Sequence, residues 1–194
     1  MLIPDQLRRT VKHTVGVASH KHATESPTMT DWIRMEDRGP PVTEADVAYF
    51  ETRIGMSLPQ DYRAFLVEVN GGRPDRSNCE ISWRRSAVGI NTFFSLNDPD
   101  ENLNLLTTLE WEASTSSLPS PDLISIAYVG VGPLLLAVRG SHRGEVWVLD
   151  DGDPRPVGSN PRVLWHDRRD MDRVASSFRA LLGGLRPEGF FPLR

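Results

Sequence analysis

The chain has 194 residues, of which 39% are hydrophobic, and its formal net charge at pH 7 is −4. This composition fits a soluble globular domain, and no apolar run approaches the length needed to cross a bilayer, so we expect no membrane association. The acidic balance argues against direct nucleic-acid binding, which requires clustered positive charge. A single cysteine, Cys79, excludes an intramolecular disulfide and predicts a cytoplasmic location.

The first 38 residues show little hydrophobic periodicity and contain many polar and small residues. We therefore predict a mobile or partly ordered tail over residues 1–38. The domain is expected to cover residues 39–194, with its core at about 43–185. The histidines of the tail lack the spacing and the accompanying cysteines or carboxylates of a metal site.

A first helix is predicted to begin after Thr43. Thr43 is a favourable N-cap residue, and Asp46, three positions later, completes a variant of the capping box. Apolar residues then recur with helical spacing as far as Ile54. Gly55 supplies the left-handed conformation that commonly ends a helix. We therefore expect this helix to end at the glycine.

A second helix is predicted to begin at Pro59, because proline is favoured in the first turn of a helix. Its apolar residues fall on one face, namely Tyr62, Phe65, Leu66 and Val69. The sequence Asn-Gly-Gly at 70–72 then ends it. Asp61 and Glu68 are predicted to be exposed and would repel phosphate, so the helix pair is not expected to read DNA.

After residue 80 the periodicity of the apolar residues changes and favours strands. Strands are predicted over residues 81–83, 88–96, 123–129, 133–139 and 144–151, with a further candidate strand at 163–165. Helices are predicted within residues 97–113 and from about Asp170 onward. The last helix is expected to form one apolar stripe from Met171, Val174, Ala175, Phe178, Leu181 and Leu182. We therefore predict an α+β fold, in which a mainly antiparallel sheet packs against the N-terminal helix pair and a C-terminal helix.

The helix pair contains the sequence LPxDYxxFL followed by NGG. Its matching residues are Leu58, Pro59, Tyr62, Phe65, Leu66, Asn70, Gly71 and Gly72, preceded by Glu51 and Ile54. Together with 126–127, 144–147 and 177–178, these residues make the chain similar to the SUKH superfamily, or Smi/Knr-type domain, over about residues 43–185. The resemblance implies a single SUKH-type domain. Because periodicity and capping account for the motif positions, we interpret them as structural and not as a binding site.

The sequence contains no recognisable catalytic constellation. It lacks a GxSxG nucleophile elbow, a phosphate-binding GKS or GKT loop and an HExxH zinc motif. Cys79 has no histidine nearby in the sequence. Gly130 and Gly132 precede a predicted strand and not the helix that a dinucleotide site needs. We therefore expect no catalytic residue, cofactor or metal, and an enzyme is only a third alternative.

Carboxylates cluster in two predicted turns. The first group is Asp98, Asp100 and Glu101, and the second is Asp150, Asp151 and Asp153. For each residue alone, a solvated turn is the favoured interpretation. If the two turns share a face, they form an anionic surface that attracts a cationic partner, and Trp111 would strengthen that surface if it is exposed. The alternative binding face contains Trp83, Arg84 and Arg85.

The resemblance also implies a function. The founding member of the superfamily is a yeast cell-wall regulator, and the bacterial members are mostly immunity proteins. The chain is therefore expected to bind and neutralise a cognate toxin domain of a bacterial polymorphic toxin system. We expect a basic, nuclease-like toxin, because nucleases bind phosphate. The alternative is a housekeeping intracellular interaction or regulatory module of the same fold, and a neighbouring toxin gene would favour immunity.

Overall fold

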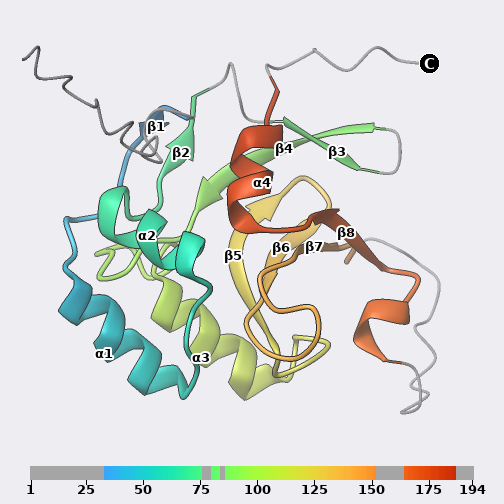
Figure 1. Cartoon of the computed structure of the whole chain (residues 1–194). Helices are drawn as coiled ribbons and strands as arrows, with labels where there is room; N and C mark the ends of the chain where they lie inside the picture. The colour runs from blue at the N-terminus through green and yellow to red at the C-terminus, as the bar shows by residue number, and fades with distance from the viewer. Residues whose placement is uncertain (1–32, 76–79, 84–85, 152–163, 187–194) are drawn as a thin grey trace, which may run out of the picture.

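A computed structural model describes residues 33–75, 80–83, 86–151 and 164–186 of the chain. Within these residues an antiparallel sheet is accompanied by four α-helices (Figure 1). The helices are α1 (Glu44–Ile54), α2 (Gln60–Glu68), α3 (Leu105–Thr115) and α4 (Phe178–Gly184). The predicted α+β fold class is confirmed. No helix among the described residues is long and apolar enough to span a membrane.

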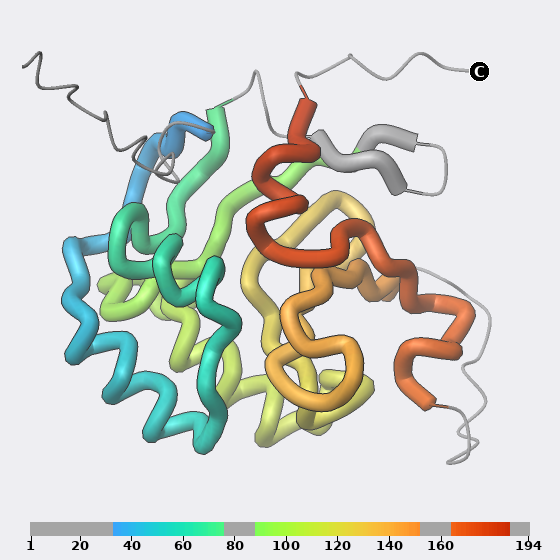
Figure 2. Tube along the Cα trace, in the orientation of Figure 1, coloured from blue at the N-terminus to red at the C-terminus, as the bar shows by residue number. Residues whose placement is uncertain are grey.

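The main sheet consists of six strands, each paired with its neighbour in sequence. They are β3 (Glu80–Trp83), β4 (Ser86–Phe93), β5 (Leu123–Val129), β6 (Gly132–Ala137), β7 (Val146–Leu149) and β8 (Met171–Ala175). All adjacent pairs are antiparallel. The β5–β6 hairpin is tight, because Val129 pairs with Gly132 and leaves two residues in the turn. Figure 2 shows that α4, in red, returns to the region of α2, in green, although the two helices are far apart in sequence.

The predicted capping of α1 is confirmed. Thr43 Oγ1 accepts a hydrogen bond from the Asp46 N–H at 3.3 Å, and Asp46 Oδ2 accepts one from the Thr43 N–H at 2.7 Å. Gly55 ends the helix with φ at +65°. Glu51 then fixes the link to α2, because its Oε1 accepts a hydrogen bond from the Leu58 N–H at 2.7 Å. Local sequence therefore determines the turn that connects the two helices.

An aromatic cluster lies where α2, α4 and β4 meet. Its members are Tyr62, Phe65, Phe93 and Phe178. Their contacting ring centroids are 4.8–6.0 Å apart, and each of the four residues is 0% exposed. Such ring contacts add to the stability that apolar burial provides. The predicted core positions of Tyr62 and Phe65 are therefore confirmed.

The Asn-Gly-Gly segment does more than end α2. Asn70, which has φ at +56°, is buried and donates from Nδ2 to the carbonyls of Pro40 at 2.6 Å and Leu96 at 2.9 Å. Its Oδ1 accepts a hydrogen bond from the Leu96 N–H at 2.8 Å. Gly71 has φ at +76°, and a Cβ atom there would lie only 2.7 Å from the Phe94 carbonyl oxygen. The segment therefore joins three parts of the chain at a close approach that requires glycine.

The domain includes residues that the sequence assigned to the tail. β1 (Met35–Glu36) pairs with β2 (Arg73–Pro74) in a small antiparallel sheet. Ile33 and Met35 are buried and belong to the main core. A stretch this short produces no clear periodicity, which is why it was included in the mobile or partly ordered tail predicted over residues 1–38. Residues 1–32 lie outside the described residues.

The predicted helix from Asp170 is wrong over its first half. Residues Met171–Ala175 form β8, which pairs with β7. α4 begins only after Ser177, whose Oγ accepts a hydrogen bond from the Ala180 N–H at 3.0 Å. The apolar spacing in 171–175 is compatible with a helix, but the segment instead forms hydrogen bonds with the edge of β7. Tertiary pairing therefore overrode the local pattern.

Two smaller expectations also differ from the structure. Val163 lies outside the described residues, and Trp165–Asp167 form a short 3₁₀ helix where a strand was considered. Asp61 is half-buried and not fully exposed, because its Oδ2 accepts a hydrogen bond from the Arg179 N–H at 2.8 Å. That bond satisfies one of the free N–H groups at the start of α4.

Candidate partner-binding face

α1 and α3 lie side by side on one flank of the domain (Figure 1). An ion pair links them, with Arg53 Nη2 at 2.5 Å from Glu110 Oε1. Asn104 positions the start of α3, because its Oδ1 accepts hydrogen bonds from the Leu106 and Thr107 N–H groups at 3.0 and 3.3 Å. This side-chain cap satisfies two N–H groups that have no partner within the helix.

Two large aromatic side chains are exposed on these helices. Tyr49 on α1 is 64% exposed, and Trp111 on α3 is 57% exposed. A small hollow of about 130 Å³ lies beside Tyr49, and its lining also includes Asn97 and Glu110. The outer sides of α1 and α3 therefore adjoin the loop before α3. We define the helical face as Asp46, Tyr49, Arg53, Thr107, Glu110 and Trp111 together with residues 97–101.

The first predicted acidic turn belongs to this helical face. Asp98 is half-buried and stabilises the turn itself, because its carboxylate accepts hydrogen bonds from Ser95 Oγ and from the Asp100 N–H. Asp100 and Glu101 are exposed. Two of the three predicted carboxylates are therefore at the surface, whereas the third holds the loop in shape.

The second acidic turn follows β7. The Asp150 N–H donates to the Asp170 carbonyl at 2.8 Å, and the Asp151 N–H donates to the Val131 carbonyl at 3.2 Å. These bonds hold the turn to the start of β8 and to the β5–β6 hairpin. Three predicted residues lie outside the described part of the chain: Asp153, Arg84 and Arg85. The two acidic groups are therefore carried by different elements, and we treat them as separate surfaces.

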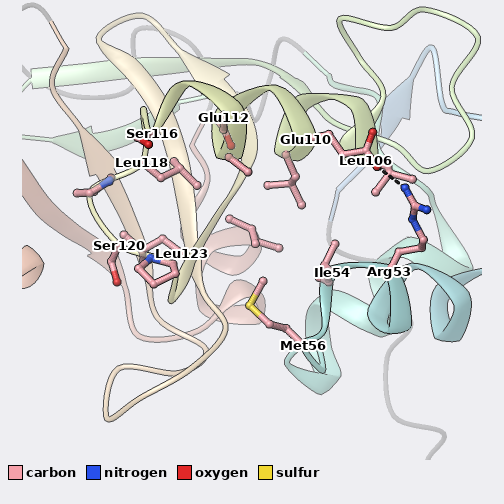
Figure 3. Close-up of a pocket in the computed structure, with 15 residues that line it drawn as sticks. Arg53, Ile54, Met56, Leu106, Glu110, Glu112, Ser116, Leu118, Ser120 and Leu123 are labelled. Atoms are coloured by element: carbon pink, nitrogen blue, oxygen red, sulfur yellow. Dashed lines mark hydrogen bonds and ion pairs between the residues drawn. The ribbon is translucent and has the colours of Figure 1, made fainter.

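A larger groove of about 620 Å³ lies between α1 and α3 (Figure 3). Most of its lining is apolar. In Figure 3, α3 runs along one side, Met56 lies on the opposite side, and Leu118 lies at the end away from the Arg53–Glu110 pair. The groove depends on the spacing between helices that are distant in sequence, so no local pattern could have revealed it.

Glu112 is the buried charged residue of this groove. It is 3% exposed, its Oε1 accepts a hydrogen bond from Ser125 Oγ, and its Oε2 has no hydrogen-bond partner among the described residues. Burial raises the pKa of this carboxyl above its ordinary value of 4.5, and the Ser125 hydrogen bond offsets only part of that effect. A sequence signal existed, because Glu112 continues the helical stripe of Leu105 and Leu109 where an apolar residue is expected.

A protein-family model matches the part of the chain that contains most of the elements described above. The model of the SMI1 / KNR4 family (SUKH-1) matches residues 41–184, which include all four α-helices and the whole six-stranded sheet. The chain belongs to this family. The resemblance identified from the sequence is therefore confirmed. No curated protein sequence matches the chain. The SUKH-1 family includes immunity proteins, and SUKH domains generally bind partner proteins.

The residues that identify this SUKH domain lie apart from the helical face. Leu58, Tyr62 and Phe65 are buried in the main core. Asn70 joins the end of α2 to the loops on either side. None of these four residues belongs to the helical face as defined above. The family pattern therefore specifies the fold and leaves the outer sides of α1 and α3 free to differ.

A polar–aromatic cluster at the β7–β8 edge of the SUKH domain was not predicted. The cluster consists of His142, Trp147, Trp165 and His166, and the centroids of its contacting rings are 4.3–5.7 Å apart. Glu145 binds His142 Nδ1 and Arg173 Nη1, each at 2.9 Å. Burial acts to raise the pKa of Glu145, but the hydrogen bonds from His142 and Arg173 outweigh burial and hold that pKa below its ordinary value. No group of three metal-ligating side chains occurs in the described ranges. We interpret the cluster as a structural feature that holds the edge of the sheet in place.

Proposed function

We propose that this protein is an immunity protein that binds a cognate toxin domain of a bacterial polymorphic toxin system. The proposal is supported by the family, whose domains generally bind partner proteins, and by the exposed aromatic residues of the helical face. Neutralisation occurs by occlusion in a one-to-one complex in the cytoplasm, without turnover or a cofactor.

Tyr49 and Trp111 are the residues expected to anchor the partner. Tyrosine and tryptophan are enriched among the residues that contribute most to binding energy at protein interfaces. Both lie on helices, so their backbones lose little conformational freedom when a partner binds. The polar residues Asp46 and Thr107 line the same hollow as Tyr49, and polar residues are typical of the rim of a protein–protein interface.

The charges of the helical face favour a basic partner. Asp100 and Glu101 are exposed, and Arg53 is already paired with Glu110. A toxin that acts on nucleic acid carries positive charge where it binds phosphate. Acidic residues around an aromatic centre therefore speed its association and orient it, so that the inhibitor covers the surface that would contact substrate.

Co-purification with the C-terminal domain encoded by the neighbouring gene tests the proposal. We expect a one-to-one complex in which the toxin is inactive. Trp111→Ala should raise the Kd of the complex at least about tenfold, as expected for an interface hot spot. Leu164→Ala is the matched control, because Leu164 is 58% exposed but lies outside the helical face. Equal effects of the two variants would contradict the assigned face, and no complex at all would favour the housekeeping module.

Association kinetics test the charge component. Asp100→Asn with Glu101→Gln, and separately Asp150→Asn, Asp151→Asn and Asp153→Asn, should slow association with a basic toxin at low salt. The effect should fade as ionic strength rises, because exposed charges are screened beyond roughly 10 Å at 0.1 M. Rates equal to wild type at low salt would show that these carboxylates are solvated turns. An acidic toxin would contradict the charge argument altogether.

A further inference from the structure

We propose that the small hollow beside Tyr49 receives one arginine side chain of the partner protein. That this partner is a toxin rests on the function proposed above. The hollow has a volume of about 130 Å³, which is well below the roughly 300–1,000 Å³ of small-molecule sites. For comparison, a cavity of about 150 Å³ in a protein core holds a benzene molecule. The hollow is therefore sized for the end of a single side chain.

The charges of the hollow favour a cationic side chain. Among the described residues that line it, Asp46 and Glu110 are carboxylates and none is cationic. Asp46 caps α1 through Oδ2, and Glu110 pairs with Arg53 through Oε1. The second oxygen of each carboxylate takes no part in these bonds, and Arg53 lines the larger groove and not the hollow. A cationic N–H donor in the hollow therefore gains charge-assisted hydrogen bonds that a neutral side chain does not.

The remaining lining favours arginine over lysine. Phe50 and Leu96 contribute apolar surface from the main core, and the methylene groups of a long cationic side chain can lie against such surface. Tyr49 also lines the hollow, and its ring is mostly exposed. A planar guanidinium group stacks on an aromatic ring and reaches carboxylates with several N–H donors, whereas an ammonium group is a compact and strongly hydrated charge.

Three capped tripeptides test the hollow on the chain alone. Acetyl-Gly-Arg-Gly-amide is titrated into the full chain, as is the same peptide with lysine or with citrulline, which keeps the shape of arginine but not its charge. NMR shifts of backbone amides locate the binding, and the affinity of one side chain is expected to be millimolar. The arginine peptide should bind at least about fivefold more tightly than the citrulline peptide, and more tightly than the lysine peptide. No shifts at the hollow, or no preference for arginine over either control peptide, would overturn the inference.

Matched variants locate the site. Glu110→Gln should reduce the affinity of the arginine peptide at least about threefold, whereas Glu68→Gln removes the same charge from an exposed residue of α2 and should not. Thr107 and Ser114 are both exposed on α3, but only Thr107 lines the hollow. Thr107→Trp should therefore abolish binding, and Ser114→Trp should preserve it. Tyr49→Ala should remove the preference for arginine over lysine. Equal effects within either matched pair would overturn the assignment to the hollow.

The toxin complex gives an independent readout. Each arginine of the toxin is replaced by alanine in turn, and the change in Kd is compared between wild type and Tyr49→Ala. One arginine should contribute strongly against wild type and much less against Tyr49→Ala. A complex in which no toxin arginine depends on Tyr49 would overturn this inference and leave the immunity role standing. Selective binding of the arginine peptide without any complex would leave the arginine-binding hollow standing and contradict the toxin as its partner.

Discussion

The aromatic cluster beneath α2 and α4 and the groove between α1 and α3 contain similar apolar side chains, but they are packed differently. In the cluster the ring centroids are 4.8–6.0 Å apart, whereas the groove keeps about 620 Å³ open. Each region has one buried oxygen without a hydrogen-bond partner in the described part of the chain, namely the Tyr62 hydroxyl and Glu112 Oε2. Three of the four cluster residues, Tyr62, Phe65 and Phe178, belong to the sequence pattern that resembles the SUKH superfamily. Of the residues that line the groove, only Ile54 belongs to that pattern.

The contacts between the helices explain the difference. Phe178 from α4 contacts Tyr62, Phe65 and Phe93, so α2 and α4 are joined by buried apolar surface. The rim between α1 and α3 is bridged by the exposed Arg53–Glu110 ion pair. An exposed ion pair stabilises a fold by about 0–1 kcal/mol, so it links these helices without drawing them into close packing. The cluster is therefore closed by buried apolar contacts, whereas the groove between α1 and α3 stays open.

The largest expected effect comes from removing an aromatic ring from the cluster. Phe65→Ala should lower the free energy of unfolding by about 3–5 kcal/mol, because a fully buried ring is lost and a cavity remains. Urea denaturation measures this change. A loss below about 1 kcal/mol would mean that the cluster is no more tightly packed than the protein surface.

A matched pair of leucine truncations compares the two regions directly. Leu66 is 0% exposed in the main core, whereas Leu106 is partly exposed and lines the groove. Leu66→Ala should cost about 2–5 kcal/mol. Leu106→Ala should cost less than about 2 kcal/mol, because space is already open beside it. Equal losses in parallel urea titrations would show that the groove is packed as tightly as the core.

Glu112→Gln should change the pH dependence of stability. Burial raises the pKa of Glu112 in the folded protein above its ordinary value of 4.5, so the folded state holds the proton more tightly than the unfolded state. Stability from this group is therefore present at low pH and falls as pH rises through the raised pKa. The variant should gain stability relative to wild type as the pH rises above the ordinary Glu pKa of 4.5. A constant difference between the two proteins across that range would contradict the shift.

The smallest expected effect is at the other unpartnered oxygen. The Tyr62 hydroxyl is buried and has no hydrogen-bond partner among the described residues. Tyr62→Phe removes this unsatisfied group and keeps the ring, so stability should change by less than about 1 kcal/mol and in the favourable direction. Thermal and urea unfolding of the two proteins measure the difference. A clear loss of stability would reveal a hydrogen bond to the hydroxyl.

Local chemistry made much of this fold predictable. The caps at Thr43 and Gly55 act between neighbouring residues, and both are present as expected. The stripe of α2 correctly identified buried positions such as Tyr62 and Phe65. The segment 171–175 was misassigned because its apolar spacing suits two structures, and only the partner strand β7 decides between them.

The candidate site was harder to predict from the sequence than the fold. Trp111 could be named as a candidate, but its exposure depends on which side of α3 faces the sheet. Tyr49 was missed, although it lies off the apolar stripe of α1 and on its exposed side. The groove requires the separation of α1 from α3, which follows from packing over long sequence distances and not from any local pattern.

The separation of Phe178 from α2 along the sequence has a consequence for synthesis. α2 leaves the ribosome long before α4, so Tyr62 and Phe65 lack their aromatic contacts with Phe178 until α4 has been made. Domains generally fold as units during translation, and exposed apolar surface in incomplete chains promotes aggregation. A product that stops before residue 178 therefore lacks a closed core. If the protein protects its cell from a toxin, protection begins only after α4 has been made and has packed against α2.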